Sequence, residues 1–406
     1  MLGKAGGPSR SVGLAAFSHP PFRGSLMNPS VAGLLADLVR LPSVNPMGQD
    51  AQGLPYFESR VTDYLDDYFR ALGVPYARQP VAPERENIVA RLDFPGATTT
   101  ILWEVHQDTV PVVGMTIDPY AADIRDGRLY GRGSCDVKGG MAAMLAAFTR
   151  LAKERPAGAA NVILACTADE EHTFLGVQEL VKHGLTPDYA VVAEPTLLQI
   201  VDAHKGVARW KLRTAGRACH SSRPDQGVNA IYRMGHVLAA IDQYATELIA
   251  RPAHPRLGPP TISVGRVEGG VSVNTVPDAC VIEIDRRLLP GETGAGARDH
   301  FINRLRELTP VEFACDPLWM ACPALDPSRS DAVRQRLGAA IDAVEGSHTV
   351  IAVPFGTDAS TICEAGIPAV VFGPGDIKQA HTKDEWIEVS QLERAAEILY
   401  RMAVGR

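Results

Sequence analysis

The sequence predicts an α/β protein in which a mixed-sheet domain with helices on both faces is interrupted by an inserted α+β domain. A chain of 406 residues is too long for one ordinary hydrophobic core. Apolar strands alternate with amphipathic helices early in the chain and again near its end, and the order of elements changes between these two parts. We therefore expect residues 29–204 and 320–406 to form the larger domain and residues 205–319 the inserted one. Residues 1–28, rich in Gly, Ser and Pro, are predicted to be a disordered extension.

The larger domain begins with two segments whose apolar residues recur at helical spacing, 31–39 and 57–72. Gly73 is expected to end the second helix. After these, strands are predicted at 87–92, 100–105, 162–167 and 189–193, and helices directly after Asp136 and over 175–183. The same rhythm returns later, with a helix at 332–344, a strand at 369–372 and a final helix at 390–402.

The middle of the chain has a different order of elements. It predicts a strand at 208–214, a helix at 228–245, strands at 261–267 and 279–287, a helix at 297–308 and a last strand at 311–318. A β-α-β-β-α-β order is typical of a small ferredoxin-like sandwich.

Composition excludes some classes of function. The net charge of −7 and the pI near 5.9 disfavour a nucleic-acid binder, whose surface is usually basic. No apolar stretch approaches the length of a membrane span. The seven cysteines are scattered and form no CxxC pair, so we expect reduced thiols and a cytoplasmic protein.

Acidic and histidine side chains follow several of the predicted strands directly. Taken singly, each is more often an ordinary loop residue or part of a solvated face. Ligands of open α/β sheets, however, bind beyond the carboxyl ends of the strands, where these residues would gather. The joint pattern therefore predicts a metal site that draws on His106, Asp108, Asp169, Glu170, Glu171, Glu194 and His381.

The residue types indicate which metal. Imidazole combined with carboxylate suits zinc and its neighbours, whereas sites made only of oxygen suit calcium or magnesium. Asp136, Glu171 and Glu194 would bring three negative charges against the four positive charges of two divalent ions, and a bridging hydroxide would balance the remainder. Glu170, beside Glu171, would then be free to accept the proton of the attacking water.

At these residues the chain resembles the dinuclear-zinc metallopeptidase family, which includes acetylornithine deacetylase, succinyl-diaminopimelate desuccinylase, aminoacylase and glutamate carboxypeptidase. The matching stretches run in family order over nearly all of the chain after Ser30. They include His106-Gln-Asp108-Thr-Val-Pro111, Tyr130-Gly-Arg-Gly-Ser-Cys-Asp136, Thr167-Ala-Asp-Glu-Glu171, Ala193-Glu-Pro-Thr196, Ala203-His-Lys-Gly206, His220-Ser-Ser-Arg-Pro224, Asn274-Thr-Val-Pro277, Asp285-Arg-Arg287 and Ala380-His381.

The resemblance implies a role for each residue of the predicted metal site. Asp136 would bridge two divalent ions, zinc first and cobalt as the alternative. His106 and Glu194 would complete one metal position, and Glu171 and His381 the other. In catalysis, Glu170 would be the general base and then the general acid, while Asp108 would orient His106.

The inserted domain resembles the family's lid and dimerisation domain, which implies a homodimer. His220 would then reach the active site of a partner subunit and stabilise an oxyanion, with help from Asn274. Arg287 would bind a substrate carboxylate. For Arg287 a surface ion pair with Glu292 or Asp285 is an equally good interpretation, and for Asn274 the alternative is ordinary turn chemistry.

Within the family, the motifs are most similar to those of acetylornithine deacetylases. We therefore expect hydrolysis of a small N-acyl amino acid such as N-acetylornithine. A desuccinylase, an aminoacylase, a dipeptidase and a carboxypeptidase remain alternatives with the same metal centre. A catalytically silent homologue is the alternative from another class, and the presence of all five ligands and Glu170 argues against it.

Overall fold

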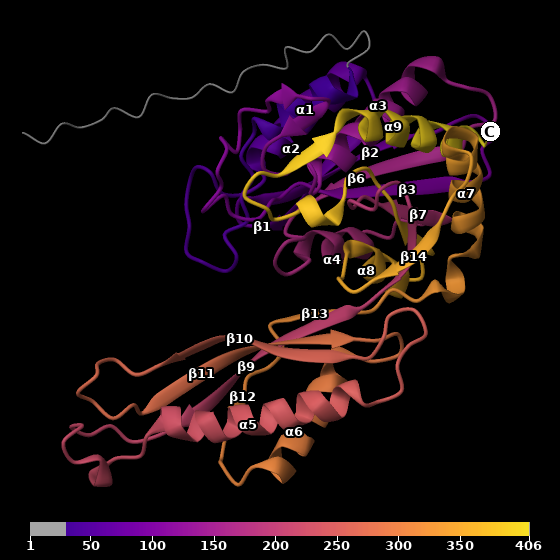
Figure 1. The fold of residues 1–406 in the computed structure, drawn as a ribbon. Helices are drawn as coiled ribbons and strands as arrows, with labels where there is room; N and C mark the ends of the chain where they lie inside the picture. The colour runs from indigo at the N-terminus through magenta and orange to yellow at the C-terminus, as the bar shows by residue number, and fades with distance from the viewer. Residues whose placement is uncertain (1–29, 406) are drawn as a thin grey trace, which may run out of the picture.

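The computed structural model describes residues 30–405, so the predicted extension at 1–28 lies outside the described residues (Figure 1). The larger part of the chain is built on an eight-stranded mixed sheet, as predicted. In spatial order its strands are β1 (Tyr76–Ala82), β2 (Arg85–Leu92), β6 (Asn161–Thr167), β3 (Thr100–His106), β7 (Tyr189–Val192), β15 (Ala369–Val371), β8 (Ile200–His204) and β14 (Val350–Val353). The central strands β6, β3, β7 and β15 are parallel to their neighbours within this group, so their carboxyl ends meet at one edge.

Helices cover both faces of this sheet. On one face pack α1 (Val31–Val39), α2 (Ser59–Leu72), α3 (Lys138–Glu154), α7 (Asp331–Glu345) and α9 (Val389–Val404), and on the other α4 (Leu175–Lys182) and α8 (Asp358–Glu364). Strand β3 divides its side chains between the two cores, because successive residues of a strand point to opposite faces. Trp103 lies in the core with α3, and Leu102 lies in the core with α4.

Local signals explain where the first helices begin and end. The Ser30 hydroxyl accepts a hydrogen bond from the Gly33 N–H and caps the start of α1. Helix α2 ends at Gly73, whose φ of 71° lies in the left-handed region that favours glycine. Both boundaries agree with the sequence prediction.

The inserted segment forms a second sheet that is antiparallel throughout. It contains β9 (Gly206–Ala215), α5 (Ala230–Ile249), β10 (Thr261–Gly269), β11 (Ala279–Leu288), α6 (Gly294–Leu308) and β12 (Ala314–Cys315), with strand order β10-β11-β9-β12. Trp210 points from β9 toward the helices and packs edge-on against Phe301 of α6, with ring centroids 5.2 Å apart. Figure 1 shows α5 and α6 on the side of this sheet that is turned away from the larger one. The predicted β-α-β-β-α-β order is confirmed.

The predicted strand at 311–318 is found only in part, as the two-residue strand β12. Only β12 and β13 (Met320–Cys322) pair with β9 in this region. Pro317 interrupts the run, because proline has no N–H to donate to a strand ladder. Since β13 lies within 320–406 yet pairs with the small sheet, the exact domain division stays a prediction.

Several short elements were not predicted. They include β1, β8, β14 and α8, a small sheet of β4 (Ile124–Arg125), β5 (Arg128–Tyr130) and β16 (Trp386–Glu388), and the single 3₁₀ turns η1 (Pro224–Gln226), η2 (Pro327–Arg329) and η3 (Ile377–Gln379). All seven cysteines are free thiols, as expected. Within residues 30–405, no helix combines the length and the apolar character needed to span a bilayer.

Candidate metal centre

The carboxyl edge of the large sheet gathers most of the predicted site residues. His106 is the last residue of β3, Glu170 and Glu171 follow β6, and Glu194 follows β7. Because these strands are parallel, their ends bring the side chains to one place. Asp136 joins them from the loop before α3.

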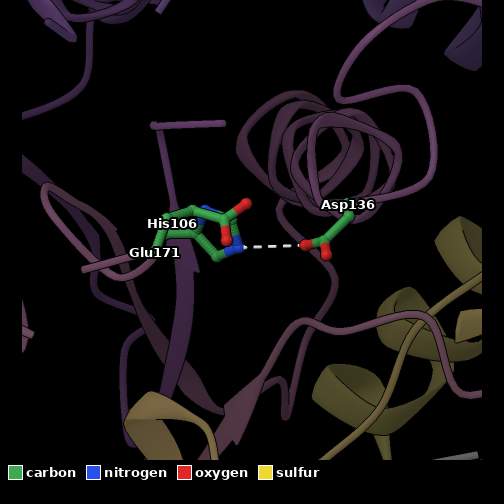
Figure 2. Close-up of side chains that lie close together, drawn as sticks. All are labelled: His106, Asp136 and Glu171. Atoms are coloured by element: carbon green, nitrogen blue, oxygen red, sulfur yellow. Dashed lines mark ion pairs between the residues drawn. The ribbon is translucent and has the colours of Figure 1, made fainter. Parts of the chain in front are cut away.

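Asp136 lies between two histidines. Its Oδ1 is 3.3 Å from His106 Nε2 (Figure 2), and its Oδ2 is 3.2 Å from His381 Nε2. On the His381 side, Glu171 Oε2 lies 3.2 Å from the same ring nitrogen. On the other side, Glu194 Oε1 lies 3.9 Å from His106 Nε2. The five predicted ligands thus converge around one carboxylate.

Two atoms of this cluster lack the partners that buried polar atoms normally have. His106 Nε2 and Glu171 Oε1 are buried and make no hydrogen bond, which is costly unless another group binds them. Ligand atoms of His106, Asp136 and Glu171 lie within 4.8 Å of one another, as do those of His106, Glu170 and Glu194. Open lone pairs on a nitrogen and several oxygens fit divalent ions of the zinc type.

Electrostatics also favours bound cations. Burial, together with neighbouring carboxylates, raises the pKa of Glu194 far above its ordinary value and raises the pKa of Glu171 to about 7. Hydrogen bonds to Asp136 and Glu171 raise the pKa of His381 to about 10. Such a crowd of buried carboxylates needs positive charge to remain ionised, and divalent ions supply it.

Asp108 holds two parts of the site together. Its carboxylate accepts hydrogen bonds from the backbone N–H groups of Glu170 (3.2 Å) and Glu171 (3.1 Å). His106 Nδ1 lies 3.0 Å from the carbonyl oxygen of Asp108 and 3.6 Å from its carboxylate. The ring of His106 is therefore oriented mainly by the backbone of Asp108, while the carboxylate fixes the Glu170–Glu171 loop.

A buried network behind this loop was not predicted from the sequence. Asn45 Nδ2 donates to Asp108 (2.8 Å) and to Asp169 (2.9 Å), and Arg85 pairs with Asp169. Asp169 has a φ of 68°, which turns the chain sharply just before Glu170. No pattern marks Asn45 or Arg85 as site residues, because they lie far from the motifs along the chain.

Glu385 was also missed. Its buried carboxylate accepts hydrogen bonds from the N–H groups of Gly133 (3.1 Å), Cys135 (2.9 Å) and Asp136 (3.0 Å), and Arg132 pairs with it at 2.6 Å. It thereby fixes the loop that presents Asp136. In the sequence, the pair Asp384-Glu385 looks like an ordinary solvated turn.

A cavity of about 170 Å³ opens beside the metal cluster, between the two sheets. Arg287 of β11 lines it, and its Nε donates to Asp285 Oδ1 at 2.7 Å. Of the two ion pairs considered for Arg287, the one with Asp285 is present, whereas Glu292 pairs with Arg286 instead.

His220 and Asn274 do not line this cavity. They lie together on the inserted part of the chain, where the Ser221 N–H donates to the Asn274 carbonyl at 3.0 Å and His220 and Thr275 form an isolated antiparallel β-bridge. The side chain of Asn274 accepts from Ser272 at 2.7 Å, which is the turn chemistry considered for it.

Comparison with known proteins places these residues in a family. Residues 102–404 match Peptidase family M20/M25/M40. An acetylornithine deacetylase of Myxococcus xanthus is 32% identical over 355 residues, covering 84% of this chain and 90% of that protein. An acetylornithine deacetylase of Vibrio cholerae serotype O1 is 30% identical, covering 83% and 89%.

Solved structures share the fold. An M20 metallo-carboxypeptidase from Sulfolobus solfataricus matches with a TM-score of 0.74 at 19% identity, over 91% of this chain and 98% of that one. A Bacillus subtilis M20 peptidase described as dinuclear metal-binding matches with a TM-score of 0.64 at 16% identity, over 92% and 96%. The chain belongs to Peptidase family M20/M25/M40 and is a metal-dependent amidohydrolase that uses divalent ions.

Proposed function

We propose that this enzyme hydrolyses the amide bond of a small N-acyl amino acid with two zinc ions, cobalt being the alternative metal. The observation that carries the proposal is the convergence of His106, Glu171, Glu194 and His381 around the Asp136 carboxylate, beside a cavity of about 170 Å³, with His106 Nε2 and Glu171 Oε1 buried and making no hydrogen bond. Asp136 would bridge the ions. His106 and Glu194 would hold one ion, and Glu171 and His381 the other.

The chain's own groups account for the proton movements. When bound, the ions supply a water that ionises near neutral pH and polarise the amide carbonyl. Glu170 would take a proton from the attacking water as the water oxygen bonds to the carbonyl carbon, and would pass that proton to the leaving nitrogen as the C–N bond breaks, giving a carboxylic acid and an amine. Burial raises the pKa of Glu170 well above its ordinary value, so that it can hold this proton between the two transfers. Asp108 keeps Glu170 in place through its backbone N–H.

The relatives named acetylornithine deacetylase favour N-acetylated amino acids, with N-acetylornithine as the first compound to test. Desuccinylase, aminoacylase, dipeptidase and carboxypeptidase activities are the alternatives, since solved relatives with this fold include a carboxypeptidase and dipeptidases. A silent homologue would bind metal and hydrolyse nothing.

We further propose a homodimer in which His220 and Asn274 complete the active site of the partner subunit and Arg287 binds a substrate carboxylate. His220 is exposed and outside the cavity of its own chain, which leaves it free to act elsewhere. The seven free thiols suit a reducing compartment, so we place the enzyme in the cytoplasm.

The decisive experiment compares the wild type with Glu170→Gln. Both proteins should bind about two metal ions per chain, because Glu170 is not assigned as a ligand. Turnover of N-acyl amino acids should fall by about 10²–10⁴-fold, the usual contribution of a positioned acid–base group. Glu179→Gln is the matched control and should behave like the wild type, because Glu179 is a half-buried glutamate of α4 that pairs with Lys182. Near-normal turnover of Glu170→Gln would remove Glu170 from the mechanism.

The same preparation tests the function itself. Chelation should abolish hydrolysis, and added Zn²⁺ or Co²⁺ should restore it, across a panel of N-acyl amino acids and dipeptides. If the protein binds two metal ions and hydrolyses no member of the panel, the silent alternative holds.

A further inference from the structure

The walls of the active-site cavity differ sharply in charge. Its floor is the metal cluster, and a largely apolar wall is formed by Phe174, Val207, Met320, Phe355 and Ile377. The remaining charged side chains on the lining are two arginines, Arg209 and Arg287, both from the inserted sheet. Every acidic residue that lines the cavity belongs to the metal cluster.

The two arginines are held as a pair by one carboxylate. Arg209 of β9 and Asp285 of β11 are direct cross-strand partners, and Arg287 lies two residues further on the same face. Arg209 Nε donates to Asp285 Oδ2 at 2.8 Å, and Arg287 Nε donates to Asp285 Oδ1 at 2.7 Å. Two positive charges against one negative charge leave a net charge of +1 on this face of the cavity.

The terminal nitrogens of Arg209 remain available. Among residues 30–405, the hydrogen bond from Nε to Asp285 is the one that its guanidinium makes, so its two terminal NH₂ groups are unpaired. The guanidinium also lies 5.7 Å from the ring centre of Trp319, which stacks on His172 at 5.3 Å. An arginine held by a carboxylate at Nε and by an indole is pre-organised to present its terminal nitrogens to an anion.

A cationic group would find no partner on these walls. The ammonium of an ornithine or lysine side chain is stabilised when buried only if a carboxylate or other acceptor pairs with it. Of the carboxylates that line the cavity, Asp136, Glu171 and Glu194 would bind the ions and Glu170 would carry the catalytic proton in the proposed function, while Asp285 is paired with the two arginines. The apolar wall instead suits an uncharged side chain.

We propose that Arg209 is a specificity-determining residue that, together with Arg287, binds the free carboxylate of the substrate, and that the cavity prefers N-acyl amino acids with uncharged side chains over basic ones. This inference rests on the proposed function and deepens it by naming the substrate class. It gives N-acetyl-L-methionine precedence over N-acetyl-L-ornithine, and free acids precedence over their amides.

Binding is measured calorimetrically with the zinc-loaded Glu170→Gln enzyme, and hydrolysis with the zinc-loaded wild type. The probes are N-acetyl-L-methionine, N-acetyl-L-methioninamide and N-acetyl-L-ornithine. We expect the free acid to bind at least about tenfold more tightly than the amide, because a charge-assisted hydrogen bond is lost with the carboxylate. In the Glu170→Gln enzyme, adding Arg209→Gln should remove most of this difference in affinity. In the otherwise wild-type enzyme, Arg209→Gln should raise KM for the acid more than it lowers kcat. Arg209→Lys should restore part of the preference for the acid.

Arg213→Gln is the matched control, since Arg213 lies on the same face of β9 but pairs with Asp316 outside the cavity. It should keep the preference for the acid. The proposal is overturned if Arg209→Gln keeps the acid-to-amide ratio of the parent enzyme, if N-acetyl-L-ornithine is bound better than N-acetyl-L-methionine, or if none of the three compounds binds. Binding in the expected order without hydrolysis by the wild type would instead contradict the proposed function and leave this inference standing.

Discussion

Asn45 allows two carboxylates to lie side by side behind the metal cluster. Its single amide nitrogen donates one hydrogen bond to Asp108 and one to Asp169, so both of its hydrogens are used. The two acids in turn control the turn that carries Glu170 and Glu171. Through these two acids, Asn45 helps to fix Glu171, the proposed ligand, and Glu170, the proposed proton carrier.

From this geometry we expect Asn45→Ala to weaken metal binding by about 10–100-fold, the usual effect of losing a residue that orients a ligand. The apo protein should also lose about 1–3 kcal/mol of stability from the unpaired buried groups. Zinc competition with a chelator measures the first effect, and urea unfolding of the apo protein the second. Asn161→Ala is the matched control. Asn161 lies away from the site, where its Oδ1 accepts a hydrogen bond of 2.8 Å from the Phe94 N–H, so its loss should lower stability without changing metal affinity. Equal metal affinity in both variants would contradict the role of Asn45.

Residues such as Asn45 and Glu385 could not be predicted, whereas His106 and Glu194 could. The latter follow apolar strands whose pattern is visible in the sequence, and the parallel sheet then brings them together. Asn45 and Glu385 lie in irregular segments, and their partners are 63 and 249 residues away in the chain. Nothing local marks a side chain whose function depends on such distant contacts.

At the scale of elements, the loop from Gly131 to Asp136 is the least regular part of the centre. Its one internal backbone hydrogen bond runs from the Ser134 N–H to the Gly131 carbonyl, and three other N–H groups, those of Gly133, Cys135 and Asp136, converge on the buried carboxylate of Glu385 just before β16. Since Asp136 lies at the end of this loop, Glu385 determines where it sits relative to the histidines.

Glu385→Ala should therefore destabilise the protein by about 3–5 kcal/mol, because it leaves Arg132 and three N–H groups buried without their acceptor. Metal content should fall with it, since Asp136 loses its support. Thermal unfolding and metal analysis of the purified variant are the measurements. Glu388→Ala, three residues along at the exposed end of β16, provides the control. A Glu385→Ala protein with wild-type melting temperature would show that the loop is held by other contacts.

Helices and strands were predicted correctly where the apolar pattern runs over many residues. They were missed where a short segment becomes a strand only through its hydrogen bonds to a neighbouring strand. Helix α3 and strand β6 carry strong patterns: the helix was predicted directly after Asp136 and begins at Lys138, and the strand was predicted to within one residue. Strand β1 contains Pro80, which a central strand would not tolerate, but β1 pairs only with β2 at the edge of the sheet. The four-residue β14 is too short to show a period of its own.

At the scale of the whole molecule, the chain passes twice between the two sheets, once from β8 into β9 and once after β13. These two passages are in contact. The Leu325 N–H donates to the His204 carbonyl at 3.1 Å. Elsewhere, Arg256 of the inserted part reaches Asp202, a fully buried residue of β8, at 2.6 Å. These contacts set the position of the inserted sheet over the metal cluster, and with it the position of Arg209 and Arg287.

At Gly206 the backbones of the two passages are in close contact. A Cβ at this position would be 2.5 Å from the Cys322 carbonyl oxygen and 2.6 Å from the Ala324 nitrogen, both backbone atoms that cannot rotate away. Gly206→Ala should therefore cost about 1–3 kcal/mol of stability and shift the inserted sheet, raising KM while the metal content stays at the wild-type level. Melting temperature, metal analysis and steady-state kinetics measure these effects. Gly235→Ala is the control, because a Cβ there has nothing within 4 Å, and alanine should stabilise α5 slightly. If Gly206→Ala matches the wild type in both melting temperature and KM, the contact between the passages does not govern how the two sheets are arranged.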